Sequence, residues 1–246
     1  MVEPLFISPV ATGTTVGSKL KIAGAEAKHA ISVRRLQVGE AIAVSDGQGR
    51  RVRGKVSQVT KEYLELEVFS VDEIARPTPQ IVLVQALAKG DRDEMAVQAC
   101  TELGIQTVIP WQSERSVSIW KPEKQAKHRQ RWQAIATEAA KQSLRAFIPN
   151  VEQVLGTAEL AQKLKEYELT LVLDPTSKVS ITAIDLTPHR SIAVVVGPEG
   201  GISAQELETF SAAGLSLVFM GSGILRTSTA GVAVVSYLQA QLGNWS

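Results

Sequence analysis

Short runs of alternating apolar and polar positions fill the N-terminal part of the chain. A period of two is typical of strands that bury one face. The turn sequence Asp46-Gly47-Gln48-Gly49 separates two of these runs, and a short helix is expected from Glu26 to the pair Arg34-Arg35. The runs together predict a small β-barrel. The expected strands cover residues 20–22, 41–44, 52–56 and 64–68.

The pattern changes at Arg76-Pro77-Thr78-Pro79, where proline removes backbone donors and restricts the residue before it. We expect a domain boundary there, between residues 1–74 and 75–246. Beyond it, continuous apolar strands alternate with helical segments, an order that predicts a parallel α/β sheet buried on both faces. Strands are expected at residues 81–87, 107–109, 169–173, 192–196 and 215–219, and helices at 92–103 and 125–144.

A glycine-rich turn follows one of the buried strands. The apolar run at 192–196 leads into Gly197-Pro198-Glu199-Gly200-Gly201, and Ser203 with Glu206 forms a capping box that starts the next helix. Ligands of open α/β sheets bind beyond the carboxyl ends of the strands, so this turn has a functional position. It matches neither G-x-G-x-x-G nor a P-loop, which argues against a dinucleotide or a nucleoside triphosphate. An ordinary tight turn is the alternative.

A second turn of the same kind follows the last expected strand, and its sequence from Met220 to Ala230 is MGSGILRTSTA. Thr227 or Ser228 is a good N-cap for the next helix. The apolar run at 232–238 predicts that this helix is buried or packs against a partner subunit. An arginine between such a turn and a buried helix is costly unless it is paired, so we expect Arg226 to be ion-paired or functional.

Charge restricts any RNA-binding role to local patches. The chain has 246 residues, of which 44% are hydrophobic, so it can bury a full core, but its net charge of +1 is not that of a general nucleic-acid binder. In the stretch 121–145, seven cationic residues face two acidic ones, and Arg51, Arg53 and Lys55 alternate along one strand. Either patch could follow a phosphate backbone, and either could be a solvated surface.

Cysteine use and the absence of targeting features predict a cytoplasmic location. Cys100 is the only cysteine, which excludes an intramolecular disulfide and suits a reducing compartment. No basic segment precedes an apolar stretch at the start, and no apolar run approaches the ~20 residues that cross a bilayer, so no membrane insertion is expected. His29, His128 and His189 lie in separate segments without ligand spacing, so no metal is expected.

Motifs along the chain are similar to those of one family. GPEGG with S-x-x-E at 197–206, followed by G-x-x-ILRT-x-TA at 221–230, resembles the paired cofactor loops of the RsmE family of ribosomal RNA methyltransferases. Gly223 and Ser228 depart from the family pattern, which often has a basic residue before ILRT and an acid after it. The resemblance covers nearly the whole chain, because further similar segments lie at residues 29, 34–40, 89–92, 99–104, 113–116, 131–132 and 138–143.

The resemblance implies a fold, a cofactor and a reaction. The fold would be a PUA-like β-barrel in residues 1–74 and a SPOUT-class α/β methyltransferase domain in residues 75–246, whose C-terminal segment is threaded through a trefoil knot. The cofactor would be S-adenosylmethionine, with no metal, and the protein a homodimer with each active site completed near the subunit interface. The reaction would be methylation of N3 of a specific uridine in small-subunit ribosomal RNA, within the small ribosomal subunit.

Three sets of site residues follow from the motifs and the charge pattern. Arg226 is the candidate for stabilising negative charge on the uracil carbonyls. Glu199 is the candidate for orienting the base or accepting a proton, and its alternative role is a structural acceptor of loop amides. The resemblance places Leu173, Gly197, Glu199, Gly200, Gly201, Met220, Gly221, Ile224 and Leu225 in the cofactor pocket. RNA contacts are expected from Arg34, Arg35, Arg51, Arg53, Lys55, Arg115, Lys124, Lys127 and Arg131.

Two other functions are compatible with parts of this pattern. One is a non-catalytic RNA-binding protein that associates with the ribosome, and the intact GPEGG and ILRT segments argue against it. The other is an enzyme of the same class that methylates transfer RNA or a ribose hydroxyl, which the cofactor loops alone do not exclude. The N-terminal barrel and the segments at 89–92 and 101–104 favour ribosomal uridine.

Overall fold

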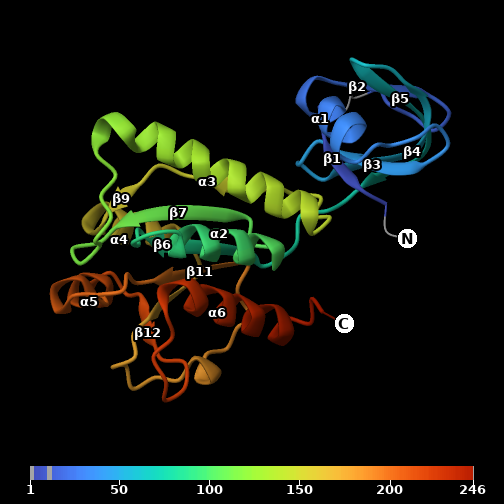
Figure 1. The fold of residues 1–246 in the computed structure, drawn as a ribbon. Helices are drawn as coiled ribbons and strands as arrows, with labels where there is room; N and C mark the ends of the chain where they lie inside the picture. The colour runs from blue at the N-terminus through green and yellow to red at the C-terminus, as the bar shows by residue number, and fades with distance from the viewer. Residues whose placement is uncertain (1–2, 10–12, 246) are drawn as a thin grey trace. The chain divides into compact units, whose positions relative to one another are not determined.

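The computed structural model describes residues 3–9 and 13–245, which form two compact units. One unit comprises the chain up to Arg76 together with Ala140–Ile148. The other comprises Pro77–Ala139 and the chain from Pro149 onward. The return of Ala140–Ile148 to the first unit has no counterpart in the sequence pattern, which suggested a single division near residue 75. Figure 1 follows both units along the chain from blue to red.

The first unit is built on a five-stranded sheet with the order β1-β3-β4-β5-β2. β1 and β3 pair in parallel, and the other neighbours pair antiparallel. Ile22, Val52 and Leu66 of the sheet share an apolar core with Ala27 of the short helix. The predicted strands and helix are confirmed. The elements are β1 (Leu5–Ile7), β2 (Lys19–Ala23), α1 (Gly24–Lys28), a π-helical turn (His29–Val33), β3 (Ala41–Ser45), β4 (Arg50–Val59) and β5 (Tyr63–Glu73).

The segment Ala140–Ile148 packs on the turn between β3 and β4. The amide of Gly49 donates to the carbonyl of Ala146 at 3.1 Å, and the amide of Ile148 donates to the carbonyl of Gly47 at 3.0 Å. The φ angle is +72° at Gly47 and +108° at Gly49, and a Cβ on either glycine would lie 2.5 Å from a side chain of the segment. Glycine is therefore required at both positions of this turn.

A nearly buried ion pair also holds the returning segment. The ammonium of Lys141 lies 2.8 Å from Oε1 of Glu26, and its side chain is only 4% exposed. The other oxygen of Glu26 accepts a hydrogen bond from the amide of Ile7 at 3.2 Å. Lys141 is one of the cations of the 121–145 patch, and its burial means that it does not contribute to an exposed cationic surface.

The second unit is built on a parallel sheet with the order β12-β10-β11-β6-β7-β8, and β9 pairs with β7. Every pairing is parallel, as predicted, so the carboxyl ends of the strands lie at one edge. The strands are β6 (Gln80–Ala86), β7 (Thr107–Gln112), β8 (Asn150–Val151), β9 (Leu155–Gly156), β10 (Leu169–Leu173), β11 (Ser191–Val196) and β12 (Ser216–Val218). The helices are α2 (Arg92–Glu102), α3 (Pro122–Gln142), α4 (Thr157–Lys163), α5 (Ala204–Ala212) and α6 (Thr227–Gln241), with 3-10 turns at Leu164–Glu166 and Ile181–Ala183.

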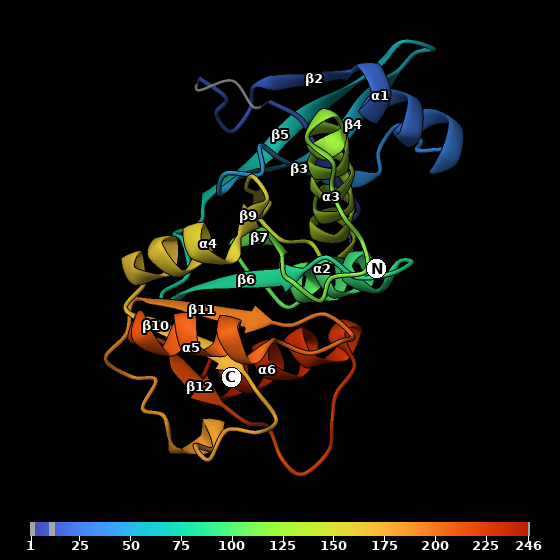
Figure 2. The ribbon, with the colours of Figure 1, turned by 90° about the vertical axis from the view of Figure 1, so that its left-hand side faces the viewer.

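Helices cover both faces of this sheet. Because successive strand residues point to opposite faces, neighbouring residues of one strand lie in different cores. Leu83 of β6 lies in a core shared with α2, α3 and α6. Its neighbour Val84 lies in a second core, shared with α4 and α5. The two views in Figures 1 and 2 show the helices on either side of the strands. None of the helices in the described ranges has the length and apolar composition needed to span a membrane.

Candidate active site

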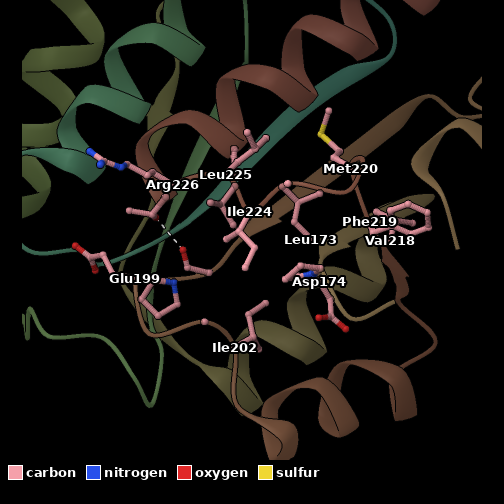
Figure 3. A pocket seen from close by; sticks show the side chains of 18 of the residues that line it. Leu173, Asp174, Glu199, Ile202, Val218, Phe219, Met220, Ile224, Leu225 and Arg226 are labelled. Atoms are coloured by element: carbon pink, nitrogen blue, oxygen red, sulfur yellow. Dashed lines mark hydrogen bonds between the residues drawn. The ribbon is translucent and has the colours of Figure 1, made fainter. Parts of the chain in front are cut away.

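A pocket of about 400 Å³ opens beyond the carboxyl ends of β10, β11 and β12 (Figure 3). It lies among the two glycine-rich turns, and all the residues assigned to the cofactor pocket line it except Gly200. Arg226 lines it as well. The parallel sheet thus brings together two segments that the sequence separates, and the site forms where the fold class places ligands.

The first turn holds its backbone close to the pocket. The amide of Gly201 donates to the carbonyl of Pro198 at 2.9 Å, and the φ of Gly201 is +71°. A Cβ on Gly197 would lie 2.7 Å from the side chain of Ile202. Gly200 faces the other way, because a Cβ there would lie 3.1 Å from Cβ of Arg115. Gly197 and Gly200 therefore allow close packing of Ile202 and of the loop that carries Arg115, whereas Gly201 supplies the left-handed backbone of the turn and faces open space.

The predicted capping box is confirmed and extends beyond its own helix. Ser203 donates from its amide to Oε2 of Glu206 at 3.0 Å, and Ser203 Oγ accepts from the amide of Glu206 at 3.3 Å. Oε1 of the same buried carboxylate accepts from the amide of Glu114 and from the hydroxyl of Thr157, both at 2.8 Å. Glu206 thereby fixes the glycine-rich turn to the loop after β7 and to the start of α4.

A second buried contact fixes the turn to α6. The hydroxyl of Thr227 donates to the carbonyl of Gly197 at 2.8 Å and accepts from Nε2 of Gln85 at 2.9 Å. The expectation that Thr227 or Ser228 caps this helix is therefore wrong. The N-cap position belongs to Arg226, whose side chain forms no capping bond, because the Thr227 hydroxyl is engaged with the turn.

The carboxylate of Glu199 is held by the loop between β6 and α2. Its Oε1 accepts from the amide of Lys89 and from Nη1 of Arg92, both at 3.0 Å. Burial acts to raise the pKa of Glu199, but hydrogen bonds from backbone amides and from Arg92 outweigh burial and hold this pKa below its usual value. A carboxylate with a lowered pKa holds a proton weakly, and its Oε1 already accepts two hydrogen bonds, so the geometry favours the structural alternative.

The second turn presents apolar and cationic side chains to the pocket. Ile224 is 84% exposed and Leu225 is 39% exposed, although both are apolar. Covering such a side chain contributes about 1.5–3 kcal/mol, so this surface favours a ligand with an apolar face. Arg226 is also exposed, and within residues 3–9 and 13–245 its guanidinium forms no ion pair. The expected ion pair of Arg226 is therefore not found among the described residues, and its functional role stays a prediction.

Arg92 and Asp174 line the pocket but were not among the predicted site residues. Arg92 is the first residue of α2, and the motif at 89–92 was the signal that could have drawn attention to it. Asp174 directly follows β10 and accepts from the amide of Thr176 at 2.9 Å. Because β6 and β10 are not neighbours along the chain, only the strand order reveals that both residues reach one pocket.

The basic strand of the first unit is largely ion-paired. Glu3 accepts from Nε and Nη2 of Arg53, both at 2.7 Å. This hydrogen bond from Arg53 lowers the pKa of Glu3, which keeps the pair ionised. Arg51 lies 3.7 Å from Asp72. Arg34, Arg35 and Lys55 are exposed and form no ion pair within the described part of the chain.

The cations expected to bind RNA in the second unit likewise include both ion-paired and exposed side chains. Arg131 pairs with both oxygens of Glu94, one of them at 2.7 Å. Nη1 of Arg115 donates to the carbonyl of Gly200 at 3.2 Å, which places this arginine beside the glycine-rich turn. Lys124 and Lys127 lie on α3, are exposed and have no acidic partner among the residues that the structure describes.

Side chains that bind metals do not gather in the described residues. No group of three or more histidine, cysteine, aspartate or glutamate side chains in residues 3–9 and 13–245 could hold a metal ion. The acids nearest the pocket, Glu199 and Asp174, are each engaged in hydrogen bonds with neighbouring donors.

Comparison with known sequences assigns both units. The family described as "RNA methyltransferase domain" matches residues 76–239, and the "RNA methyltransferase PUA domain" family matches residues 22–69. The Ribosomal RNA small subunit methyltransferase E of Mycobacterium bovis is 35% identical over 100% of this chain and 94% of its own length. The protein of the same name from Bacillus subtilis is 31% identical over 89% of each chain.

Comparison with solved structures agrees. The crystal structure of Ribosomal RNA small subunit methyltransferase E from Neisseria gonorrhoeae, bound to S-adenosylmethionine, superposes with a TM-score of 0.88. It is 29% identical in sequence, over 98% of both chains. Fold and site together therefore define an α/β RNA methyltransferase with an N-terminal PUA domain. The chain belongs to the RsmE family, the ribosomal RNA small subunit methyltransferases E, which use S-adenosylmethionine.

Asp93 supports the loop that reaches Glu199. Its side chain is buried, and its two oxygens accept from the amide of Ala88 at 2.9 Å and from the amide of Glu94 at 2.8 Å. Burial raises the pKa of Asp93 from 3.8 to about 6. The folded protein therefore binds a proton at a pH where the unfolded chain has already released it.

This pKa predicts a pH dependence of stability. Between about pH 4 and pH 6 the folded state holds more protons than the unfolded state at this site, so the free energy of unfolding falls as pH rises, by at most about 1.4 kcal/mol per pH unit. Above pH 6 the contribution is constant. Urea unfolding of the wild type and of Asp93→Asn across pH 4.5 to 7.5 measures the contribution of Asp93. The difference between the two free energies of unfolding isolates it, because the other titratable groups contribute equally to both proteins. A difference that does not change with pH would contradict the raised pKa.

Proposed function

We propose that this protein transfers a methyl group from S-adenosylmethionine to N3 of a specific uridine in small-subunit ribosomal RNA. The observation that carries the proposal is the pocket at the carboxyl edge of the sheet, where two glycine-rich turns meet and Arg226 lies at the mouth. Family membership supports a ribosomal RNA substrate. The choice of N3 and of uridine rests on the motif resemblance and on the cationic side chains around the pocket.

The residues of the pocket fit S-adenosylmethionine. A volume of about 400 Å³ and a lining of apolar side chains with exposed backbone suit an adenosine group held largely by main-chain atoms. Leu173, Ile224 and Leu225 would pack on the adenine, while Gly201, which has open space at its Cα, would allow close approach of the backbone. When bound, this cofactor supplies an electrophilic methyl group and takes up the electron pair of the broken carbon–sulfur bond. The protein then has to position the acceptor nitrogen in line with that bond.

The acceptor side of the reaction calls for fixed positive charge. N3 of uracil lies between two carbonyl groups, and loss of its proton spreads negative charge over both oxygens. Arg226, exposed beside Ile224 and Leu225, is suited to stabilise that charge. A uridine inside a paired stem could not reach the pocket, so the target lies in an irregular region or is flipped out of its stack.

The same fold could in principle methylate transfer RNA or a ribose hydroxyl. A ribose hydroxyl is a far weaker acid than the imide of uracil and needs a strong proton acceptor. Glu199, whose pKa is held below its usual value by backbone amides and Arg92 against the effect of burial, does not suit that task. A base imide is therefore the better match, and a non-catalytic role is disfavoured by the intact pocket.

We further propose that the C-terminal segment is knotted. Two contacts support the proposal: the amide of Phe219 donates to the carbonyl of Val179 at 2.9 Å, and the amide of Ile181 donates to the carbonyl of Phe219 at 3.1 Å. The loop after β10 thus lies along the strand that precedes α6. The Thr227 hydroxyl then returns the chain to the end of β11. Threading of this kind would hold the cofactor turns in place.

The nature of the product tests the proposed reaction directly. Purified protein, S-adenosylmethionine and small ribosomal subunits from cells lacking the gene should yield N3-methyluridine, detected by mass spectrometry of the digested RNA. Calorimetry should show one cofactor bound per chain, with activity insensitive to a chelator. Methylation of a ribose hydroxyl, or product only with transfer RNA, would contradict the assignment.

The unpaired lysines of α3 should contribute more to RNA binding than the paired arginines of the first unit. Replacing Lys124 and Lys127 by glutamine should reduce the slope of log affinity against log salt by about one per lysine, because each releases counterions from the RNA. Arg53→Gln should change the slope less, since Glu3 already neutralises this cation. Filter binding across a salt series measures these slopes. A slope change for Arg53→Gln as large as the change per lysine on α3 would contradict the prediction.

A homodimer is proposed because α6 buries only one side within the chain. Gly231, Val234 and Leu238 are buried, whereas Ala233 is only half-buried despite its apolar side chain. Sedimentation at micromolar concentration should give twice the chain mass. Ala233→Arg should shift the protein to the monomer by placing a charge in the interface. A wild-type monomer with full activity would contradict the proposal.

A further inference from the structure

Arg92 is a second arginine at the mouth of the pocket that contains Arg226. It is brought there by the pairing of two central strands, because Gln85 near the end of β6 lies opposite Val196 at the end of β11. The loop after β6 therefore runs beside the turn after β11. About half of the Arg92 side chain remains exposed, at 45%, so the guanidinium is accessible to a ligand while it contacts Glu199.

Both arginines lie at the positive ends of helices. Arg92 is the first residue of α2, and Arg226 is the N-cap residue of α6. Cations are disfavoured at these positions by the helix dipole, whereas an anion is stabilised there. Glu199 is the single acidic side chain that pairs with either guanidinium in the described part of the chain, because Asp174, the other acid that lines the pocket, is hydrogen-bonded to Thr176. The positive charge of the two arginines is therefore only partly offset by a direct partner.

The carboxylate of Glu199 is placed to orient Arg92. One oxygen, Oε1, accepts from both the Lys89 amide and Arg92 Nη1 at 3.0 Å, so it fixes the loop and the guanidinium together. Figure 3 shows the side chains of Glu199 and Arg226 on the same side of the pocket. An arginine held at this place requires little reorganisation when charge develops on the acceptor.

We propose that Arg92 and Arg226 are paired catalytic cations, each stabilising charge on one of the two carbonyl oxygens of the target uracil, and that Glu199 is the positioning residue for Arg92. This inference rests on the proposed N3 methylation. The N3 proton leaves to water, and the freed electron pair of N3 forms the new bond to the methyl carbon. The electrons of the broken carbon–sulfur bond go to sulfur, so charge on the uracil builds up before transfer and is lost with it.

The test uses an RNA whose target nucleotide is 5-fluorouridine, because fluorine makes the N3 proton more acidic and lessens the need for stabilising cations. With saturating cofactor and RNA, Arg92→Ala should slow single-turnover methylation of the uridine RNA by about tenfold or more. On the fluorinated RNA it should come within about threefold of the wild type. Arg226→Ala should behave in the same way. Arg92→Lys should restore only part of the rate that Arg92→Ala loses, because an ammonium is charged but lacks the planar fork of a guanidinium.

Glu199 variants separate positioning from base catalysis. Glu199→Gln keeps an oxygen acceptor for Lys89 and Arg92, so it should stay within about threefold of the wild type, whereas Glu199→Ala should approach the loss of Arg92→Ala. When Arg92 is already replaced by alanine, adding Glu199→Ala should slow methylation little further. A Glu199→Gln variant as slow as Glu199→Ala, with a full further loss when Arg92 is absent, would identify Glu199 as the base and overturn its positioning role.

Arg190→Ala is the matched control, since Arg190 is an exposed arginine immediately before β11, at the other end of the strand from the pocket. It should leave the rates on both RNAs and the cofactor affinity unchanged. If Arg92→Ala slows both RNAs equally, or weakens only RNA affinity, Arg92 does not stabilise charge on the base and the inference is wrong. If the wild-type protein forms no N3-methyluridine, the proposed function itself fails, which nucleoside mass spectrometry distinguishes.

Discussion

The parallel pairing of β6, β11, β10 and β12 is the constraint on which the site depends. Parallel strands end at one edge, so the loops that follow them meet although they are far apart in sequence. The register between β6 and β11 places the Lys89 amide at Glu199, and the return of α6 places Thr227 at Gly197. Without this pairing the glycine-rich turns would be two unrelated tight turns.

Buried polar contacts then convert loose turns into a defined pocket. Glu206 accepts hydrogen bonds from three segments, and Gln85 and Thr227 form a short chain that ends on the carbonyl of Gly197. Such contacts are costly to leave unsatisfied in a low-dielectric interior, so each one selects a single arrangement of its loop. By contrast, the side chains of Ile224 and Arg226 at the pocket are exposed, and the described residues form no buried polar contact with them.

Electrostatics divides the cations into two functional groups. On β4, ion pairs with Glu3 and Asp72 offset the charge of Arg53 and Arg51, and Lys141 is buried against Glu26. On α3, Lys124 and Lys127 are exposed and have no acidic partner among the residues that the structure describes, whereas Arg131 pairs with Glu94. At the pocket, Arg92 pairs with Glu199. A net charge of +1 therefore does not exclude the proposed RNA binding, because exposed cations such as Lys124 and Lys127 still form local patches.

The sequence by itself determined the local elements and the chemistry of the two turns. Periodicity identified the strands around the Asp46–Gly49 turn and the buried strands of the parallel sheet. The capping box and the ILRT segment marked the two turns that line the pocket, because these features depend on neighbours a few residues away. Only the tertiary structure decided the partners. In the folded chain the Thr227 hydroxyl binds the carbonyl of Gly197 instead of capping its helix, and Arg53 pairs with Glu3. Lys141 is buried, and Arg92 lines the pocket. Those outcomes depend on strand order and long-range packing, which no local pattern encodes.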